Sequence, residues 1–230
     1  MVSVDGSSNT MRVSSGTVGV VVKVERNSDS CTPTTRDGGA CRLFKVVNGG
    51  ELFLSWVHLW GGKVASEWSW NDDSKELDML DSFGGLVFLR DSSSLLHAVG
   101  SIFGTGSIDD MPTEKASWSG GAIFARGGTI VILEDSSVIG NCADSEGGGI
   151  TAGVGTKLRL IRTVVRGNKI TTSRSSAGGG GIAVYLDSLL TAVASTISDN
   201  SAPTGKGGGL HLRYGCETTG AESNHGCNRA

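Results

Sequence analysis

The sequence predicts an all-β fold: a right-handed, single-stranded parallel β-helix whose coils each contain three short strands. Two observations carry this prediction. A glycine phrase followed by an aliphatic residue recurs at residues 120–123, 147–150, 179–182 and 207–210. An asparagine lies 18 residues after that aliphatic residue in three successive units, at Asn141, Asn168 and Asn200. The distance from each asparagine to the next glycine phrase varies, which indicates a repeated structural unit with one tolerant loop.

Three segments of each unit show the two-residue period of a β-strand. Apolar residues recur two, eight, ten and fifteen positions after the aliphatic residue in the units that begin at Val87, Ile123, Ile150 and Ile182. These columns are Leu89, Ala125, Ala152 and Val184; Leu95, Val131, Leu158 and Leu190; His97, Leu133, Leu160 and Ala192; and Ile102, Val138, Val165 and Ile197. One unit cannot bury its apolar side alone, so we expect the units to stack strand on strand, about 4.8 Å apart. The right hand is expected because parallel crossover connections prefer it.

The recurring asparagines and glycines are assigned to the corners of the coils. Asparagine tolerates the left-handed backbone conformation, and its amide can bond to neighbouring backbone groups. Repeated at one corner, the amides of Asn141, Asn168 and Asn200 can form a structural ladder along the stack. The glycine phrases mark a second corner, where a Cβ atom does not fit. We therefore assign no catalytic role to either feature.

Four segments are predicted along the 230 residues. Residues 1–16 are polar and are expected to be disordered or to form a cap. Residues 17–83 are expected to form degenerate N-terminal coils. Residues 84–214 form the regular coils, beginning with a weaker one in which Thr105 takes the asparagine position. Residues 215–230 are expected to be a C-terminal tail, the start of a next coil in a fragment of a longer protein.

Composition and charge limit the classes of partner. The formal net charge of −3 offers no electrostatic argument for nucleic acid. No apolar run reaches the roughly 18 residues that a membrane helix needs, and the N-terminus lacks the pattern of a signal peptide. The five cysteines cannot all pair within one chain, although Cys31 with Cys41 and Cys216 with Cys227 are close enough in sequence to bridge. Free thiols are an equal alternative, and no metal site is predicted.

Residues 120–143, GGAIFARGGTIVILEDSSVIGNCA, resemble the GGA[IL]…FxxN repeat of chlamydial polymorphic outer-membrane proteins, with Val or Ile in place of the usual Phe. The resemblance covers residues 84–210 well and residues 17–41 faintly. It implies a pectin-lyase-like β-helix fold and a surface-exposed region with adhesive roles. An extracellular or cell-surface location is thus an expectation from the resemblance alone.

Candidate functional residues lie where the repeat is broken. The longest return loop, between Thr105 and Ile123, carries the candidate catalytic residues Asp109, Asp110, Glu114 and Lys115. Trp118 from the same loop, with Trp56 and Trp60 from the degenerate coils, could stack on sugar rings. The alternative for the tryptophans is that they fill irregular coils as large structural side chains.

Two functions follow from these candidates. The first is a non-enzymatic surface module for adhesion that binds a glycan or a protein, without a cofactor. The alternative is a polysaccharide-acting lyase, hydrolase or epimerase on the same scaffold, which needs paired carboxylates or bound calcium. No column of acidic residues appears in the regular coils, so the sequence favours the first function.

Overall fold

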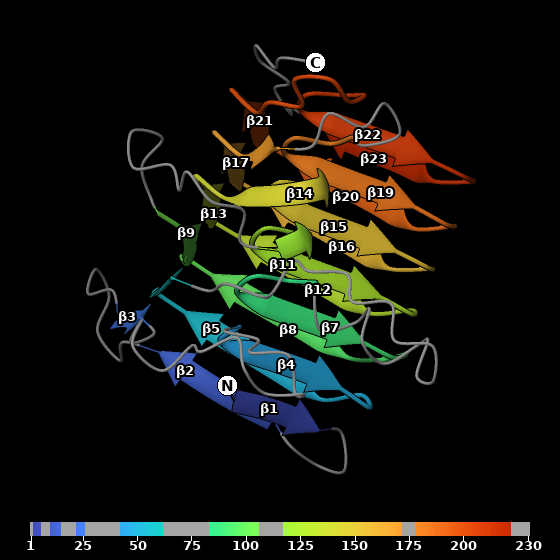
Figure 1. Ribbon diagram of the computed structural model, residues 1–230. Helices are drawn as coiled ribbons and strands as arrows, with labels where there is room; N and C mark the ends of the chain where they lie inside the picture. The colour runs from blue at the N-terminus through green and yellow to red at the C-terminus, as the bar shows by residue number, and fades with distance from the viewer. Residues whose placement is uncertain are drawn as a thin grey trace, which may run out of the picture.

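The computed structural model describes residues 2–5, 10–14, 22–25, 42–61, 83–105, 117–171 and 178–221, and Figure 1 shows a stack of parallel strands. All the regular secondary structure in these ranges is β-strand. Every pair of neighbouring strands in these ranges runs parallel, and within each sheet the strands follow one another in chain order. The predicted all-β fold of stacked parallel strands, the arrangement of a parallel β-solenoid, is therefore confirmed.

Three long sheets run along the stack. Sheet I consists of β1 (Val2–Asp5), β4 (Phe44–Val47), β7 (Val87–Arg90), β11 (Ile123–Arg126), β15 (Ile150–Gly153), β19 (Ile182–Tyr185) and β22 (Leu210–Arg213). Sheet II consists of β2 (Thr10–Ser14), β5 (Glu51–Ser55), β8 (Leu95–Val99), β12 (Ile130–Glu134), β16 (Lys157–Ile161), β20 (Leu189–Val193) and β23 (Glu217–Ala221). Sheet III consists of β3 (Val22–Glu25), β6 (Val57–Trp60), β9 (Ile102–Gly104), β13 (Ser137–Ile139), β17 (Val164–Arg166) and β21 (Thr196–Ser198).

A fourth, short sheet lies in the segments between the asparagine position and the next glycine phrase, which the repeat predicts to be loops. Sheet IV consists of β10 (Ser117–Ser119), β14 (Cys142–Glu146) and β18 (Lys169–Ile170). Three coils therefore carry four strands rather than the predicted three. The sequence gives little sign of this sheet because its strands are short and their surroundings differ in length from coil to coil.

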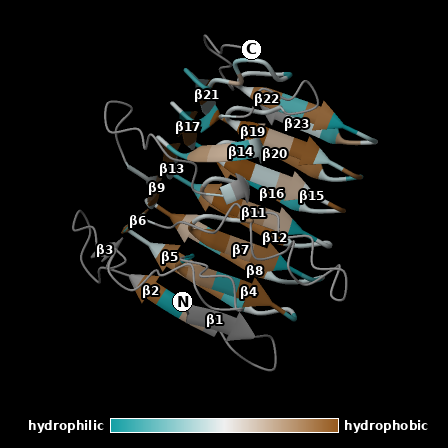
Figure 2. Cartoon of the chain, viewed as in Figure 1, coloured by the Kyte–Doolittle hydropathy of each residue, from teal (hydrophilic) through white to brown (hydrophobic). Residues whose placement is uncertain are grey.

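The apolar interior lies between the sheets, and Figure 2 shows hydrophobic colour along the strands and hydrophilic colour at many corners. Equal positions of successive coils stack on one another. One such buried column in sheet II is Leu52, Leu96, Val131, Leu158 and Leu190, and one in sheet III is Leu59, Phe103, Val138, Val165 and Ile197. Burying each of these larger side chains contributes about 1.5–3 kcal/mol, which only stacked coils can achieve.

The coil that begins at Val87 is one residue out of the predicted register. Val87 pairs with Ile123, but Leu95 pairs with Ile130, so the turn after β7 contains one extra residue. The inward residues of this coil are consequently Leu96, Ala98 and Phe103 instead of the predicted Leu95, His97 and Ile102.

The same shift affects the end of that coil and the side chain of His97. Gly104 pairs with Ile139, so Thr105 falls one position before the asparagine column. His97 faces outward, where its Nε2 lies 3.2 Å from Oε1 of Glu134. The predicted position of His97 in an apolar column is therefore wrong.

Left-handed residues turn the chain at the corners. Between sheets I and II, two consecutive residues have positive φ, as in Val154-Gly155, Leu186-Asp187 and Tyr214-Gly215. At the asparagine corner, the left-handed residue is the one before the asparagine, namely Gly140, Gly167 or Asp199. The asparagines themselves therefore do not supply the left-handed conformation that their residue type suggested.

Two columns of buried hydroxyls stabilise the corners on either side of sheet II. Ser94, Thr129, Thr156 and Ser188 lie between sheets I and II, and Ser101, Ser136, Thr163 and Ser195 lie between sheets II and III. Their hydroxyls accept from the backbone of the preceding coil, as Ser188 Oγ does from Thr156 N at 3.1 Å and Ser195 Oγ from Thr163 N at 3.1 Å. These columns bridge coils where strand pairing is interrupted, so they satisfy backbone groups that would otherwise be buried without partners.

Both predicted end segments contribute strands. Within residues 1–16, β1 pairs with β4 and β2 pairs with β5. Near the other end, β22 and β23 extend sheets I and II by pairing with β19 and β20. Among the described cysteines, Cys142 is buried and Cys216 is half-buried. Within the described ranges, no helix has the length and apolar character needed to cross a lipid bilayer.

Candidate functional site

The sequence-predicted site residues are only partly within the described structure. Asp109, Asp110, Glu114 and Lys115 lie outside the described residues. Trp118 belongs to β10, but its side chain also lies outside the description. The roles of these residues therefore stay predictions. Other side chains form the candidate site within the described residues.

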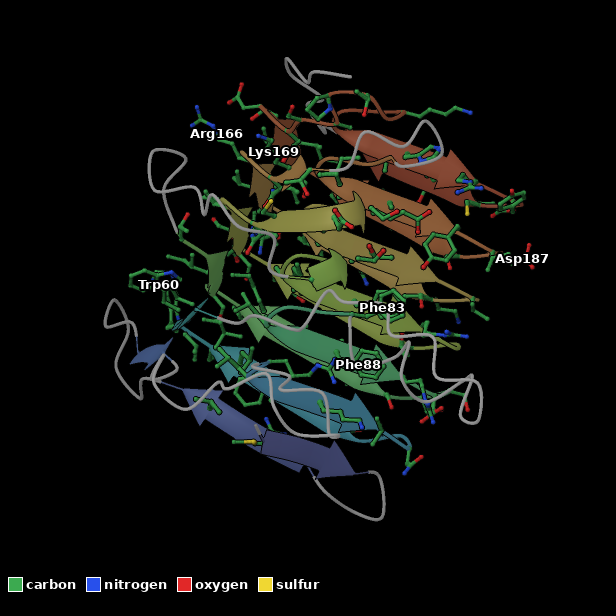
Figure 3. The ribbon with its side chains drawn as sticks, viewed as in Figure 1. Trp60, Phe83, Phe88, Arg166, Lys169 and Asp187 are labelled. Atoms are coloured by element: carbon green, nitrogen blue, oxygen red, sulfur yellow. The ribbon has the colours of Figure 1, made fainter. Side chains whose placement is uncertain are left out.

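Trp56 and Trp60 take different positions on one coil. Trp56 occupies the left-handed corner between β5 and β6, and its ring covers Gly100, where a Cβ atom would meet it at 2.7 Å. Trp60 ends β6 and is 38% exposed; Figure 3 places it on the flank of the stack opposite Asp187. Trp56 therefore has a packing role, whereas Trp60 presents part of its ring to solvent.

The asparagine column forms a continuous ladder of hydrogen bonds. Nδ2 of Asn141 donates to Oδ1 of Asn168 at 2.9 Å, and Nδ2 of Asn168 donates to Oδ1 of Asn200 at 3.0 Å. The same Nδ2 atoms donate to carbonyl oxygens of the preceding coil, Phe103 and Val138. Because these amides are buried and donate their hydrogen bonds to neighbouring coils, their role is structural.

The outer face of sheet I is covered by aromatic side chains at β7 and β11. Phe88 and Phe124 point outward from β7 and β11, yet they are only 1% and 2% exposed. Their rings stack with centroids 5.7 Å apart, and Phe83 stacks on Phe124 at 4.4 Å; Figure 3 shows Phe83 and Phe88 in front of the sheet. The outer face of sheet I is thus packed here and cannot take a ligand at these residues.

The same face carries polar groups toward β22. Arg126, Gly153, Tyr185 and Arg213 share one register column of sheet I. Gly153 leaves room for the Tyr185 ring, since a Cβ atom there would overlap it. Glu146, at the end of β14, meets this column: Nη1 of Arg213 lies 3.2 Å from Oε1 of Glu146. A carboxylate, a phenol and a guanidinium from three coils are therefore brought together.

His211 and Lys206 complete the group, which we call the Glu146 cluster: Glu146, Tyr185, Lys206, His211 and Arg213. The imidazole of His211 lies over Gly178, where a side chain would overlap its Nδ1. His211 follows Phe88, Phe124, Thr151 and Ala183 in the outward column of sheet I, and it is the first of that series to be only half-buried.

Burial and charge set the protonation of this cluster. Burial raises the pKa of the Glu146 carboxyl, and the Arg213 charge partly opposes that rise. Burial, followed by the negative charge of Glu146, raises the pKa of the Tyr185 phenol. Burial, followed by the charges of Arg213 and Lys206, lowers the pKa of His211 below its usual 6.5. At neutral pH, His211 and Tyr185 are therefore uncharged.

Beside the cluster lies an open hollow of about 450 Å³ lined by Lys206, His211, Leu212, Arg213 and Tyr214. Tyr214 is 65% exposed, and Nη2 of Arg213 donates to its hydroxyl at 2.9 Å. The Arg213 guanidinium also lies 4.8 Å from the centroid of the Tyr214 ring. The hollow thus offers an aromatic face, an apolar side chain and cationic groups within one surface.

Sequence patterns alone did not assign these residues to a site. Tyr185 and Arg213 do carry a signal in the sequence. Together with Arg126 and Gly153, they each come three residues after the aliphatic residue of their unit and so form one column. Glu146 carries no such signal, since it belongs to the unpredicted sheet IV. Within the described residues, no group of three His, Cys, Asp or Glu side chains is placed to hold a metal ion.

The fold and the cluster define an all-β repeat protein with stacked parallel strands and a polar hollow on one sheet. Comparisons with protein-family models, with curated proteins and with solved structures find no match to this chain.

Proposed function

We propose that this chain is a right-handed parallel β-helix module, related to the repeats of chlamydial polymorphic outer-membrane proteins, that binds glycans at a cell surface without catalysis. The parallel stacking and the glycine corners support the fold and the kinship. The extracellular location is carried over from the repeat resemblance. Adhesion to another cell or to a matrix is the role that such a module serves.

The observation that carries glycan binding is the composition of the hollow. Sugar rings bind to exposed aromatic faces through their apolar C–H groups, and Tyr214 presents such a face. Lys206 and Arg213 line the same hollow and supply charge for carboxylate or sulfate groups. An anionic glycan is therefore the ligand class with the best match.

The alternative function, a polysaccharide lyase, hydrolase or epimerase, rests on Glu146. A partly buried carboxyl with a raised pKa is the type of group that serves as a general acid. Glycoside hydrolysis uses a pair of carboxyl groups, whereas the Glu146 cluster contains a single carboxyl group, that of Glu146. Binding without turnover is for this reason the better-supported function.

The test is binding to a panel of neutral, uronate-containing and sulfated oligosaccharides, measured by calorimetry. We expect Tyr214→Ala to weaken binding of the anionic members about tenfold or more, a loss of about 1.4 kcal/mol. Leu186→Ala is the matched control, since Leu186 occupies the same corner one coil earlier, is 43% exposed and does not line the hollow.

Two outcomes would change the proposal. Equal binding by the Tyr214→Ala and Leu186→Ala variants would place the ligand elsewhere. Release of unsaturated or reducing-end products by the wild type, lost in Glu146→Gln, would establish the enzyme alternative instead.

A further inference from the structure

The outward side of sheet II is unusually apolar for a surface that faces solvent. Its inward residues are buried, and its outward residues are half-buried or exposed along β5, β8, β12, β16 and β20. Seven outward positions are aliphatic: Leu95, Val99, Ile130, Ile132, Ile161, Leu189 and Val193. Strands that are apolar on both sides are typical of sheets covered on both faces, whereas solvated strands alternate with polar residues.

On this side, which we call face II, two charged strands lie between two apolar strands. The outward residues of β8 and β20 carry no acidic or basic side chain apart from His97. Between these strands, β12 carries the acidic Glu134, and β16 carries the basic, exposed Lys157 and Arg159. Over these four strands, one half of face II therefore matches the other in apolar character and carries the opposite charge. At the flanks, Glu51 on β5 and Glu217 on β23 are both acidic, which limits the affinity of the two halves for each other.

We propose that face II binds a second copy of this chain, packed face to face about a two-fold axis parallel to the strands between β12 and β16. That axis places β8 opposite β20 of the other copy, so apolar strands meet. It places β12 opposite β16 of the other copy, so Arg159 of each copy lies opposite Ile132 of the other. Glu134 is then two residues along that strand, a separation that the long arginine side chain can span to form an ion pair. Each contact occurs twice, as a two-fold interface requires.

The size of face II fits a reversible dimer. The six strands that overlap, β5 to β23, lie about 4.8 Å apart and are about 16 Å long, so they present a flat area of roughly 450 Å² per copy. Two copies then bury roughly 900 Å², an area typical of weak, transient interfaces. The dimer is expected to form at concentrations of the order of micromolar and above and to separate on dilution.

Sedimentation velocity of the wild type between about 1 and about 100 µM tests the dimer. The expected result is a rise of the mean mass toward that of two chains. Ile132→Asp, at the centre of face II, is expected to remain monomeric throughout. Ile139→Asp is the matched control, because Ile139 is equally half-buried and points outward from the neighbouring sheet III. Circular dichroism checks that both variants keep the strand content of the wild type.

Charge reversal tests the two-fold arrangement itself. Glu134→Arg and Arg159→Glu each bring like charges together in a homodimer, so each variant alone is expected to be monomeric. An equimolar mixture restores both opposite-charge pairs and is expected to dimerise.

Three results would overturn the proposal. The first is a wild type that stays monomeric over the whole range, which would leave face II to a different protein. The second is an equal loss of dimer in Ile132→Asp and Ile139→Asp. The third is a mixture of charge variants that remains monomeric.

Discussion

Nδ2 of Asn168 donates to Oδ1 of Asn200 in the next coil at 3.0 Å, while Oδ1 of Asn168 accepts both N and Nδ2 of Asn141 at 3.0 and 2.9 Å. The backbone N of Asn168 also donates to Asn200 Oδ1 at 2.9 Å. One fully buried side chain thus joins three coils. The unfolding free energy of the whole stack depends on it, because buried polar groups left without a partner are costly.

Asn168→Ala is expected to lower the free energy of unfolding by about 2–4 kcal/mol, since the backbone N of Asn141 loses its acceptor and the Val138 carbonyl loses a donor. Lys169→Ala, at the next and exposed residue, is expected to change it by less than about 0.5 kcal/mol. Urea denaturation followed by circular dichroism measures both. Equal midpoints for the two variants would contradict a stabilising role for the ladder.

Gly148→Ala is expected to destabilise the protein by about 3 kcal/mol or more, because its Cβ atom would overlap backbone oxygens of Gly180 and Lys169. Backbone atoms cannot move aside as a flexible side chain does. At Gly155, nothing lies closer than 3.9 Å, and the substitution costs only the strain of a positive φ, about 1–2 kcal/mol. Thermal unfolding measures the loss of stability in the two alanine variants. A larger loss for Gly155→Ala than for Gly148→Ala would show that steric overlap does not govern the corner at Gly148.

Val154→Gly is expected to raise the free energy of unfolding by about 1 kcal/mol. Val154 has a φ of 55°, a conformation that is unfavourable for a β-branched residue, and its side chain is 39% exposed. Val164→Gly is the control, since Val164 lies in the extended strand β17, where glycine is expected to destabilise instead. Opposite signs in chemical denaturation support the strain at Val154, whereas a loss in both variants would argue against it.

The pH dependence of stability is expected to include a contribution from His211. Its folded-state pKa lies below 6.5 because of burial and the nearby Arg213 and Lys206. The unfolded chain therefore binds a proton more readily, so stability is full above about pH 6.5 and falls as the pH drops through the lower folded-state pKa.

His211→Gln, which cannot take up that proton, is expected to lose less stability than the wild type between about pH 7.5 and about pH 5. Urea midpoints at the two pH values provide the comparison. Parallel losses in both proteins would show that His211 does not contribute.

The repeat made the stacked strands and the recurring corners predictable, because the same physical demand acts on every coil. Leu133 and Leu160 occupy the same position in the sequence repeat because both side chains must fill the same place in the interior of successive coils. The register of His97 was not predictable from spacing, since one extra residue in a turn moves every following side chain to the other side of the strand.

The candidate site was less accessible to sequence reasoning. Glu146 and Arg213 are 67 residues apart, and they meet because β14 of sheet IV ends at the glycine corner that leads into sheet I. Such a meeting depends on the path of individual return segments, which do not repeat. The hydroxyl columns did leave a signal in Thr129, Thr156 and Ser188, each six residues after the aliphatic residue of its unit.

Because each coil from β1 to β21 adds one strand to each long sheet, chain length and molecular height are separate quantities. The unit that begins at Ile123 takes 27 residues to reach Ile150, and the next takes 32 to reach Ile182, yet each raises the stack by one strand spacing. Duplication or loss of one whole unit in the gene would therefore lengthen or shorten the rod while preserving the contacts of every other coil. The return segments, which need no common length, are free to diverge into different surface loops on the same rod.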